Sequence, residues 1–171
     1  DKGVKSSNIG LYGSSLGGLV ALMTPAKSDD FGSIAVIDPP VDFKTLVREE
    51  MAYQGLPTFL WEPIYHYAGI FKGVNMLKDI PEEALAKGNK QPLLIFTGLL
   101  SERVQPHHSD DLVNIAIQNN IEYDIHKYTD MNHTQILYFY TEEYSELLSD
   151  FYQRTLLSLI HISEPTRHSS I

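Results

Sequence analysis

A serine flanked by glycines is the residue in this chain best placed to do chemistry. Residues 13–17 read Gly-Ser-Ser-Leu-Gly, a G-x-S-x-G pattern centred on Ser15, with a short apolar run at 9–12 before it and a helix-like apolar run after it. In that setting the pattern predicts a sharp strand-to-helix turn that exposes the serine hydroxyl as a nucleophile. Gly13 and Gly17 are expected where the two backbones come too close for a side chain. A glycine-rich turn without chemistry is the alternative.

The predicted nucleophile requires a base, because a serine hydroxyl is a poor nucleophile at neutral pH, and the base needs an acid to orient it. Of the seven histidines, His133 is the strongest candidate, because it lies in a predicted loop between the last strand and the last helix. His126 alternates within a predicted strand, and His66 is expected to pack inside a helical segment. His161 and His168 fall in an irregular C-terminal tail and are set aside.

A second polar run, His107-His108-Ser109-Asp110-Asp111, has residue types that can bind a metal. Adjacent residues on a helix point about 100° apart, so we expect the two histidines not to converge on one ion. The acidic pair is better explained by its favourable interaction with the positive end of a helix. The sequence therefore predicts no metal and no cofactor.

The composition limits the classes of partner. The 171 residues are enough for one domain, and 43% of them are hydrophobic, which suffices for a packed core. A net charge of −9 argues against nucleic acid or an anionic membrane surface, since both require a basic patch. The chain has no cysteine, and no apolar run predicts a transmembrane helix. The oligomeric state and the compartment stay open, with a soluble, cytoplasmic location slightly favoured.

Strands and helices are predicted to alternate along the chain. Apolar or alternating segments predict strands at 9–12, 33–38, 92–98 and 123–128. Helical patterns cover 16–26, 106–120 and about 134–157. This alternation indicates an α/β protein with a parallel sheet and right-handed crossovers. We expect the first strand to be buried on both faces and the last to lie nearer an edge.

Two segments fall outside this alternation. Residues 41–90 are helical and aromatic and form an insertion that is either a lid over the site or ordinary crossover packing. Its aromatic side chains are Tyr53, Phe59, Trp61, Tyr65, Tyr67 and Phe71. Residues 158–171 fit no element and resemble a translated cloning adapter, so we exclude them as non-native or disordered. The single predicted domain therefore covers residues 1–157.

Over residues of about 7–155 the chain resembles the C-terminal half of an α/β-hydrolase, of the prolyl-oligopeptidase-like and serine-aminopeptidase-like branch. The matching features are the turn at 13–17, the strand ending in Asp38, the strand 93–98 with the loop to Ser109, and the loop histidine His133. The resemblance implies a partial α/β-hydrolase fold, with a mostly parallel sheet of about four strands, flanking helices and the helical insertion. It also implies missing strands before Asp1, so we expect the 171 residues alone to be poorly soluble and inactive.

The chain departs from this family at the catalytic acid. Ser101 stands where the family carries its aspartate, and Glu102 follows it. Three readings stay open. Glu102 orients His133, which we rank first; or Asp38, at the end of an earlier strand, supplies the acid; or the acid is lost and the protein is weakened or silent.

The resemblance implies a serine hydrolase that cleaves an ester or amide bond through an acyl-enzyme on Ser15. His133 is then the base, Glu102 orients it, and the backbone N–H of Leu16 stabilises the oxyanion. The substrate is a small ester, a lipid or a peptide, and an acyltransferase would share the same acyl-enzyme. The alternative is a catalytically weakened relative that acts as a binding protein, because Ser101 replaces the usual acid.

Overall fold

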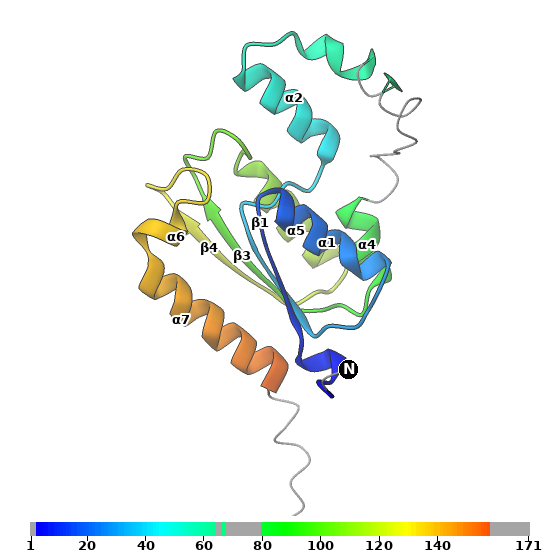
Figure 1. The fold of residues 1–171 in the computed structure, drawn as a ribbon, viewed down its shortest axis with the longest axis vertical. Coiled ribbons are helices and arrows are strands. Elements are labelled where there is room, and N and C mark those ends of the chain that lie inside the picture. Colours follow the sequence, from blue (N-terminus) through cyan, green and yellow to red (C-terminus); the bar gives the residue numbers. More distant parts are fainter. Residues whose placement is uncertain (1–2, 64–65, 68–79, 158–171) are drawn as a thin grey trace, which may run out of the picture.

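The computed structural model describes residues 3–63, 66–67 and 80–157 around a four-stranded parallel sheet (Figure 1). Its strands are β1 (Gly10–Ser14), β2 (Ser33–Ile37), β3 (Leu93–Gly98) and β4 (Tyr123–Tyr128). Each strand pairs in parallel with the next one along the chain, so their spatial order is β1-β2-β3-β4. The predicted fold class, a partial α/β-hydrolase with a parallel sheet of about four strands, is confirmed.

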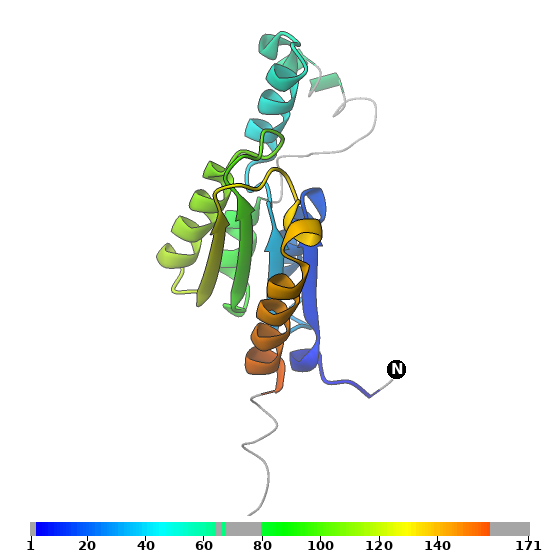
Figure 2. The same cartoon turned by 90° about the vertical axis from the view of Figure 1, so that its left-hand side faces the viewer.

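Helices cover both faces of the sheet (Figure 2). Those on the first face are α1 (Leu16–Met23), α4 (Pro81–Lys87) and α5 (His107–Gln118). Those on the second face are α6 (Ile136–Phe139) and α7 (Thr141–Tyr152), and a π-helical turn, Gln153–Leu157, follows α7. Short 3-10 turns occupy Ser6–Asn8, Thr24–Ala26 and Thr58–Leu60.

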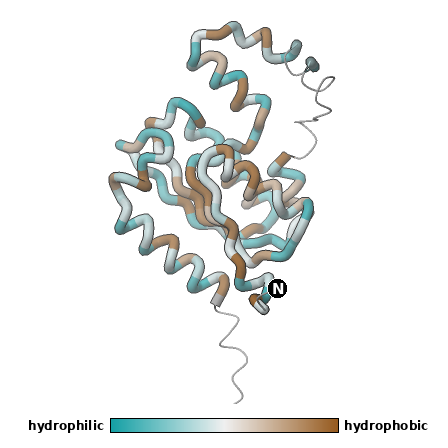
Figure 3. Tube along the Cα trace, viewed as in Figure 1, coloured by the Kyte–Doolittle hydropathy of each residue, from teal (hydrophilic) through white to brown (hydrophobic). Residues whose placement is uncertain are grey.

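The two faces are packed because side chains alternate along each strand. In β2, Ile34 and Val36 contact the first layer of helices, whereas Ala35 and Ile37 contact the second. Figure 3 shows the resulting band of hydrophobic residues along the central strands. Burial on both faces explains why β2 and β3 are continuous apolar runs.

Two details differ from the sequence prediction. Strand β1 is not buried on both faces, because only Gly13 is buried in it and Tyr12 is 46% exposed. The predicted single helix at 134–157 is interrupted at Tyr140, whose φ of −125° and ψ of 37° are not helical. The Tyr140 ring packs against Tyr128, and its hydroxyl donates to Asp130, so contacts with the preceding strand and loop take precedence over helix continuity.

The two interpretations of the segment 41–90 apply to different parts of it. Helix α4 packs beside α1 and α5 in the layer over the first face of the sheet, with Ala84 and Leu85 buried, as an ordinary crossover helix does. Helix α2 (Phe43–Tyr53) lies instead beyond the carboxyl ends of the strands (Figure 1).

Tyr65 and Phe71 lie outside the described residues, as does the tail at 158–171, so the domain limits stay a prediction. Within the described ranges, no helix combines the length and apolar composition that a membrane span requires.

Candidate active site

Ser15 occupies the sharp turn between β1 and α1. Its φ of 53° and ψ of −125° lie in a region that non-glycine residues rarely adopt, and its N–H donates to the carbonyl of Ile37 over 2.8 Å. Asp38 and Thr134 also have positive φ values, of 42° and 56°. Backbone strain of this kind persists only where the surrounding structure enforces it, and it concentrates at functional sites.

The glycines of the turn differ in their roles. A Cβ on Gly13 would lie 2.2 Å from the carbonyl oxygen of Gly17, as the sequence predicted for a tight strand–helix approach. The same expectation is wrong for Gly17, where a Cβ would meet nothing within 4 Å, because this residue faces outward. Gly18 makes the second close approach, with 2.9 Å between a built Cβ and the Cβ of Pro39.

This difference gives a matched pair of substitutions. Gly13→Ala is expected to lower the free energy of unfolding by about 3 kcal/mol, since the clash is with backbone that cannot move aside. Gly17→Ala is expected to be neutral or to stabilise by up to about 1 kcal/mol, because alanine favours helix. Urea denaturation of both variants measures the contrast, and equal destabilisation would contradict it.

The structure brings Ser15 and His133 together. The Ser15 Oγ lies 2.9 Å from His133 Nε2, although the two residues are 118 positions apart. His133 lies in the loop after β4, and Gly98 at the end of β3 lets this loop approach closely, since a Cβ there would be 2.6 Å from the carbonyl of Met131. The hydroxyl can therefore donate its proton directly to the imidazole, as a nucleophile and base require.

Among the residues that the structure describes, Asp38 is the carboxylate that pairs with the other ring nitrogen of His133. Its Oδ2 lies 3.7 Å from His133 Nδ1, and the residue is 2% exposed. The backbone N–H of Gly98 donates to one oxygen over 2.9 Å, and that of Thr134 donates to the other over 2.6 Å. These bonds hold the carboxylate in place beside the imidazole. The sequence feature that made Asp38 a candidate acid was its position directly after an apolar strand.

In the loop after β3, the Ser101 side chain is buried beside His133, whereas the Glu102 side chain is exposed to solvent. Ser101 is 4% exposed, and its Oγ lies 3.2 Å from His133 Nδ1. Glu102, the next residue, is exposed, and the structure does not bring it to His133. Among the described residues, no hydrogen bond or ion pair joins Glu102 to the site. Of the three readings of the acid, the geometry favours Asp38, with Ser101 as a second partner of Nδ1.

Burial shifts the pKa values of both members of this pair. It lowers the pKa of His133 below the usual 6.5, and the charge of Asp38 opposes that change. It raises the pKa of Asp38 above 3.8, and the N–H donors from Thr134 and Gly98 oppose that change. A lowered pKa keeps the imidazole neutral at pH 7, so that Nε2 can accept the Ser15 proton.

The direction of the His133 shift predicts the acidic limb of the pH profile. We expect kcat/KM to fall as the pH drops through the pKa of His133, with a midpoint below 6.5, because the protonated imidazole cannot act as a base. Asp38→Asn should move that midpoint lower still, since the Asp38 charge raises the pKa of His133. A pH–rate profile on an activated ester measures both midpoints; values at or above 6.5 would contradict the prediction.

Leu16 begins helix α1 directly after Ser15. Its N–H is one of the four at a helix start that lack an intrahelical acceptor, and it finds no other acceptor among the described residues. That donor is available to a developing oxyanion beside the serine. Its assignment as the oxyanion donor stays a prediction.

A pocket of about 410 Å³ opens onto Ser15 and His133. Helix α2 forms one wall of it with Phe43, Leu46, Val47, Glu50 and Met51, while Leu16, Arg103 and Val104 complete the lining. Most of the lining is apolar. The charged exception is the pair in which Arg103 Nη2 donates to Glu50 Oε1 over 3.0 Å.

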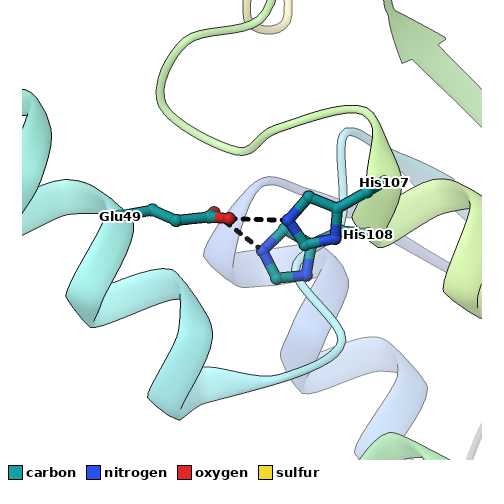
Figure 4. A group of neighbouring side chains, drawn as sticks. All are labelled: Glu49, His107 and His108. Atoms are coloured by element: carbon teal, nitrogen blue, oxygen red, sulfur yellow. Dashed lines mark hydrogen bonds and ion pairs between the residues drawn. The ribbon is translucent and has the colours of Figure 1, made fainter.

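The expectation that His107 and His108 diverge is wrong. Both rings turn toward α2, where their Nε2 atoms lie 2.6 and 3.1 Å from the two carboxylate oxygens of Glu49 (Figure 4). Their ring centroids are 4.3 Å apart. The backbone directions do differ on the helix, but flexible side chains on its first turn can both reach a group that lies over it.

A parallel sheet with a serine at the turn after β1 and a histidine in the loop after β4 is the arrangement of an α/β-hydrolase. A family model points to the same class. The chain belongs to the prolyl oligopeptidase family, whose model matches residues 1–158. No sequence among the curated proteins matches it.

Solved structures of low sequence identity share the fold. An esterase of Pyrococcus furiosus is 20% identical with a TM-score of 0.62, and the match covers 88% of this chain and 54% of the esterase. An acylaminoacyl peptidase of Pyrococcus horikoshii is 18% identical with a TM-score of 0.68, covering 90% and 25%. A puromycin-hydrolyzing peptidase of Mycobacterium tuberculosis is 17% identical with a TM-score of 0.68, covering 86% and 22%. The chain thus spans about half the length of the esterase and a quarter or less of the peptidases.

Proposed function

We propose that the protein is a serine hydrolase that cleaves an ester or amide bond through an acyl-enzyme on Ser15. The observation that carries this proposal is the 2.9 Å contact between Ser15 Oγ and His133 Nε2. Ser15 Oγ attacks the carbonyl carbon while His133 takes its proton, and the Leu16 N–H stabilises the oxyanion. His133 then returns the proton to the leaving group. Water, deprotonated by His133, releases the acid product and restores Ser15.

In this mechanism Asp38 replaces Glu102 as the acid that stabilises the charged imidazole. Its burial and its two backbone donors support the assignment, because they fix a negative charge next to Nδ1. Ser101 accepts a hydrogen bond from the Nδ1–H and keeps the tautomer in which Nε2 is free to act as a base.

One distance supports the alternative of a catalytically weakened relative. The 3.7 Å between Asp38 Oδ2 and His133 Nδ1 exceeds hydrogen-bond range, and Ser101 is the closer partner at 3.2 Å. In such a protein the pocket would serve mainly to bind its ligand.

A fluorophosphonate probe tests the proposed nucleophile in the full-length protein. We expect the probe to label the wild type and Ser14→Ala, and we expect no labelling of Ser15→Ala. Ser14 is a matched control, because it lies in the same turn and carries the same hydroxyl. An unlabelled wild type, or an undiminished label in Ser15→Ala, would remove the proposal.

The pocket supports a substrate with an apolar group near the scissile carbonyl. Phe43, Leu46, Val47 and Met51 of α2 line the same pocket as Ser15, and apolar lining of this kind binds hydrocarbon or aromatic groups. The structural relatives include an esterase and peptidases, so a small ester, a lipid and a peptide all remain within the proposal.

The isolated 171-residue chain is expected to self-associate and to lack activity. Large apolar side chains are exposed just before the edge strand β1, within it and on the following helix, namely Ile9, Tyr12, Leu16 and Val20. An unpaired strand edge beside exposed apolar residues favours aggregation. Size-exclusion chromatography and an ester assay check this, and a monomeric, cooperatively unfolding, active chain would contradict it.

A further inference from the structure

We propose that Glu49, His107 and His108 form a binding site for a divalent transition-metal ion such as Zn²⁺, which links α2 to α5. One oxygen of Glu49 and one nitrogen of each histidine lie within 4.8 Å of one another. Figure 4 shows the three side chains converging from the two helices. This site is separate from Ser15 and goes beyond the proposed hydrolase activity.

The present distances are close to those that a metal would impose. Zn²⁺ binds histidine nitrogen at about 2.0–2.1 Å with tetrahedral geometry, which sets neighbouring ligand atoms about 3.3 Å apart. His107 Nε2 lies 2.6 Å from Glu49 Oε1, and His108 Nε2 lies 3.1 Å from Glu49 Oε2, so both contacts are shorter than this separation and use different oxygens. Binding one ion through a single Glu49 oxygen therefore requires these side chains to rotate.

Asp111 gives His107 the outer partner that metal-binding histidines use. Its Oδ2 lies 3.3 Å from His107 Nδ1, one helical turn further along α5. A carboxylate in this position accepts the Nδ1–H and leaves the Nε2 lone pair directed at the metal. Burial lowers the pKa of His107, but Glu49 and Asp111 more than offset this and raise it. A metal would displace the proton that these carboxylates favour.

The Nδ1 of His108 faces a donor, the backbone N–H of Val41, so the ring proton must move when Nε2 binds a metal. His108 Nδ1 lies 3.4 Å from the backbone N–H of Val41, which places the ring proton on Nε2, facing Glu49. Metal binding through Nε2 shifts that proton to Nδ1 and breaks the long bond to Val41. The proton on His107, when present, leaves to solvent. Affinity should therefore rise with pH.

The donor set selects the class of ion. Two imidazole nitrogens and one carboxylate suit Zn²⁺, Co²⁺ and Ni²⁺, whereas Ca²⁺ and Mg²⁺ require oxygen ligands. His108 is almost fully buried and Glu49 largely so, while His107 is 42% exposed. Solvent therefore reaches the cluster from the side of His107. Because α2 also lines the pocket, an ion here would hold that wall in place.

Titration of the full-length protein with Co²⁺, followed by Zn²⁺ competition, tests the site. We expect Co²⁺ to give the strong visible absorption of tetrahedral coordination at pH 7.5, and to lose it at pH 5.5. Glu49→Gln and His107→Gln should each weaken binding by tenfold or more, and Asp111→Asn by about 10-fold to 100-fold. His126→Gln, a histidine on β4 outside the cluster, is the matched control and should bind like the wild type.

Hydrogen exchange gives a second measurement. We expect Zn²⁺ to slow exchange of the amides in α2 in the wild type and to have no such effect in His107→Gln. His107 and Asp111 are partly exposed, so these variants should fold even if a change at His108 does not. No tetrahedral Co²⁺ spectrum, or affinity unchanged in both His107→Gln and Asp111→Asn, would overturn the proposal. Loss of Ser15 labelling would leave it standing, because the two sites share no residue.

Discussion

The Ser15→Ala variant is expected to lose about 10⁶-fold in kcat on an activated ester, because a nucleophile and its base act as one unit. The Ser15 hydroxyl lies 2.9 Å from His133 Nε2, and alanine removes both the attacking oxygen and the proton that the imidazole accepts. His133→Ala is expected to lose a similar factor, and the double variant no more than either single change. Steady-state kinetics of the full-length protein measure all three.

Ser14→Ala is the control for this experiment. Ser14 is the last residue of β1, so its substitution tests the turn without removing the nucleophile. Its kcat should stay within about twofold of the wild type, as for most changes that bury no new polar group and open no cavity. A loss as large as that of Ser15→Ala would mean that the turn itself had been disturbed. Activity retained in Ser15→Ala would contradict the mechanism.

Asp38→Asn is expected to lower kcat by about 10³-fold to 10⁴-fold, because the imidazolium formed during attack loses its fixed counter-charge. The neutral amide can also donate to His133 Nδ1 and favour the wrong tautomer. Glu102→Gln is the matched change at the position that the sequence ranked first. It should stay within about twofold of the wild type, because the Glu102 side chain is exposed and lies away from His133. A large loss in Glu102→Gln with an active Asp38→Asn would reverse the assignment.

Ser101→Asp separates an efficient enzyme from a weakened one. The Ser101 Oγ is already 3.2 Å from His133 Nδ1, so an aspartate there would add a carboxylate within hydrogen-bond range. If Asp38 already supplies the charge, a second buried carboxylate beside it should bring little gain, since the two charges repel. A large increase in kcat would instead support the weakened relative. Steady-state kinetics of Ser101→Asp and the wild type on the same ester distinguish a small change in kcat from a large increase.

Local patterns in the sequence were sufficient to predict the framework of the site. The glycine spacing around Ser15 and the apolar runs on either side of it depend only on neighbouring residues, and they predicted the strand–turn–helix that the structure contains. The sequence placed His133 near Ser15 because the loop after the last strand of a parallel sheet begins at the same edge as the turn, and the structure brings the two side chains together.

The expectation for Gly17 and the ranking of Glu102 both concern which way a residue faces, and neighbours in the sequence do not determine that. Gly17 and Gly13 look equivalent in the pattern, yet only Gly13 faces the opposing backbone. The sequence ranked Glu102 above Asp38 because Glu102 directly follows the family's position along the chain, whereas the geometry favours Asp38, whose role stays a proposal. Which of two consecutive loop residues turns inward depends on the path of the loop over the sheet.

The strand–turn–helix around Ser15 and the apolar strands β2 and β3 are therefore encoded locally, in glycine spacing and apolar runs. The partners of His133, and the meeting of Glu49 with His107 and His108, were decided only by the tertiary structure. The physical reason is that both contacts join side chains from separate elements. Their approach is set by how the helices and loops pack on the sheet, and no local pattern records that packing.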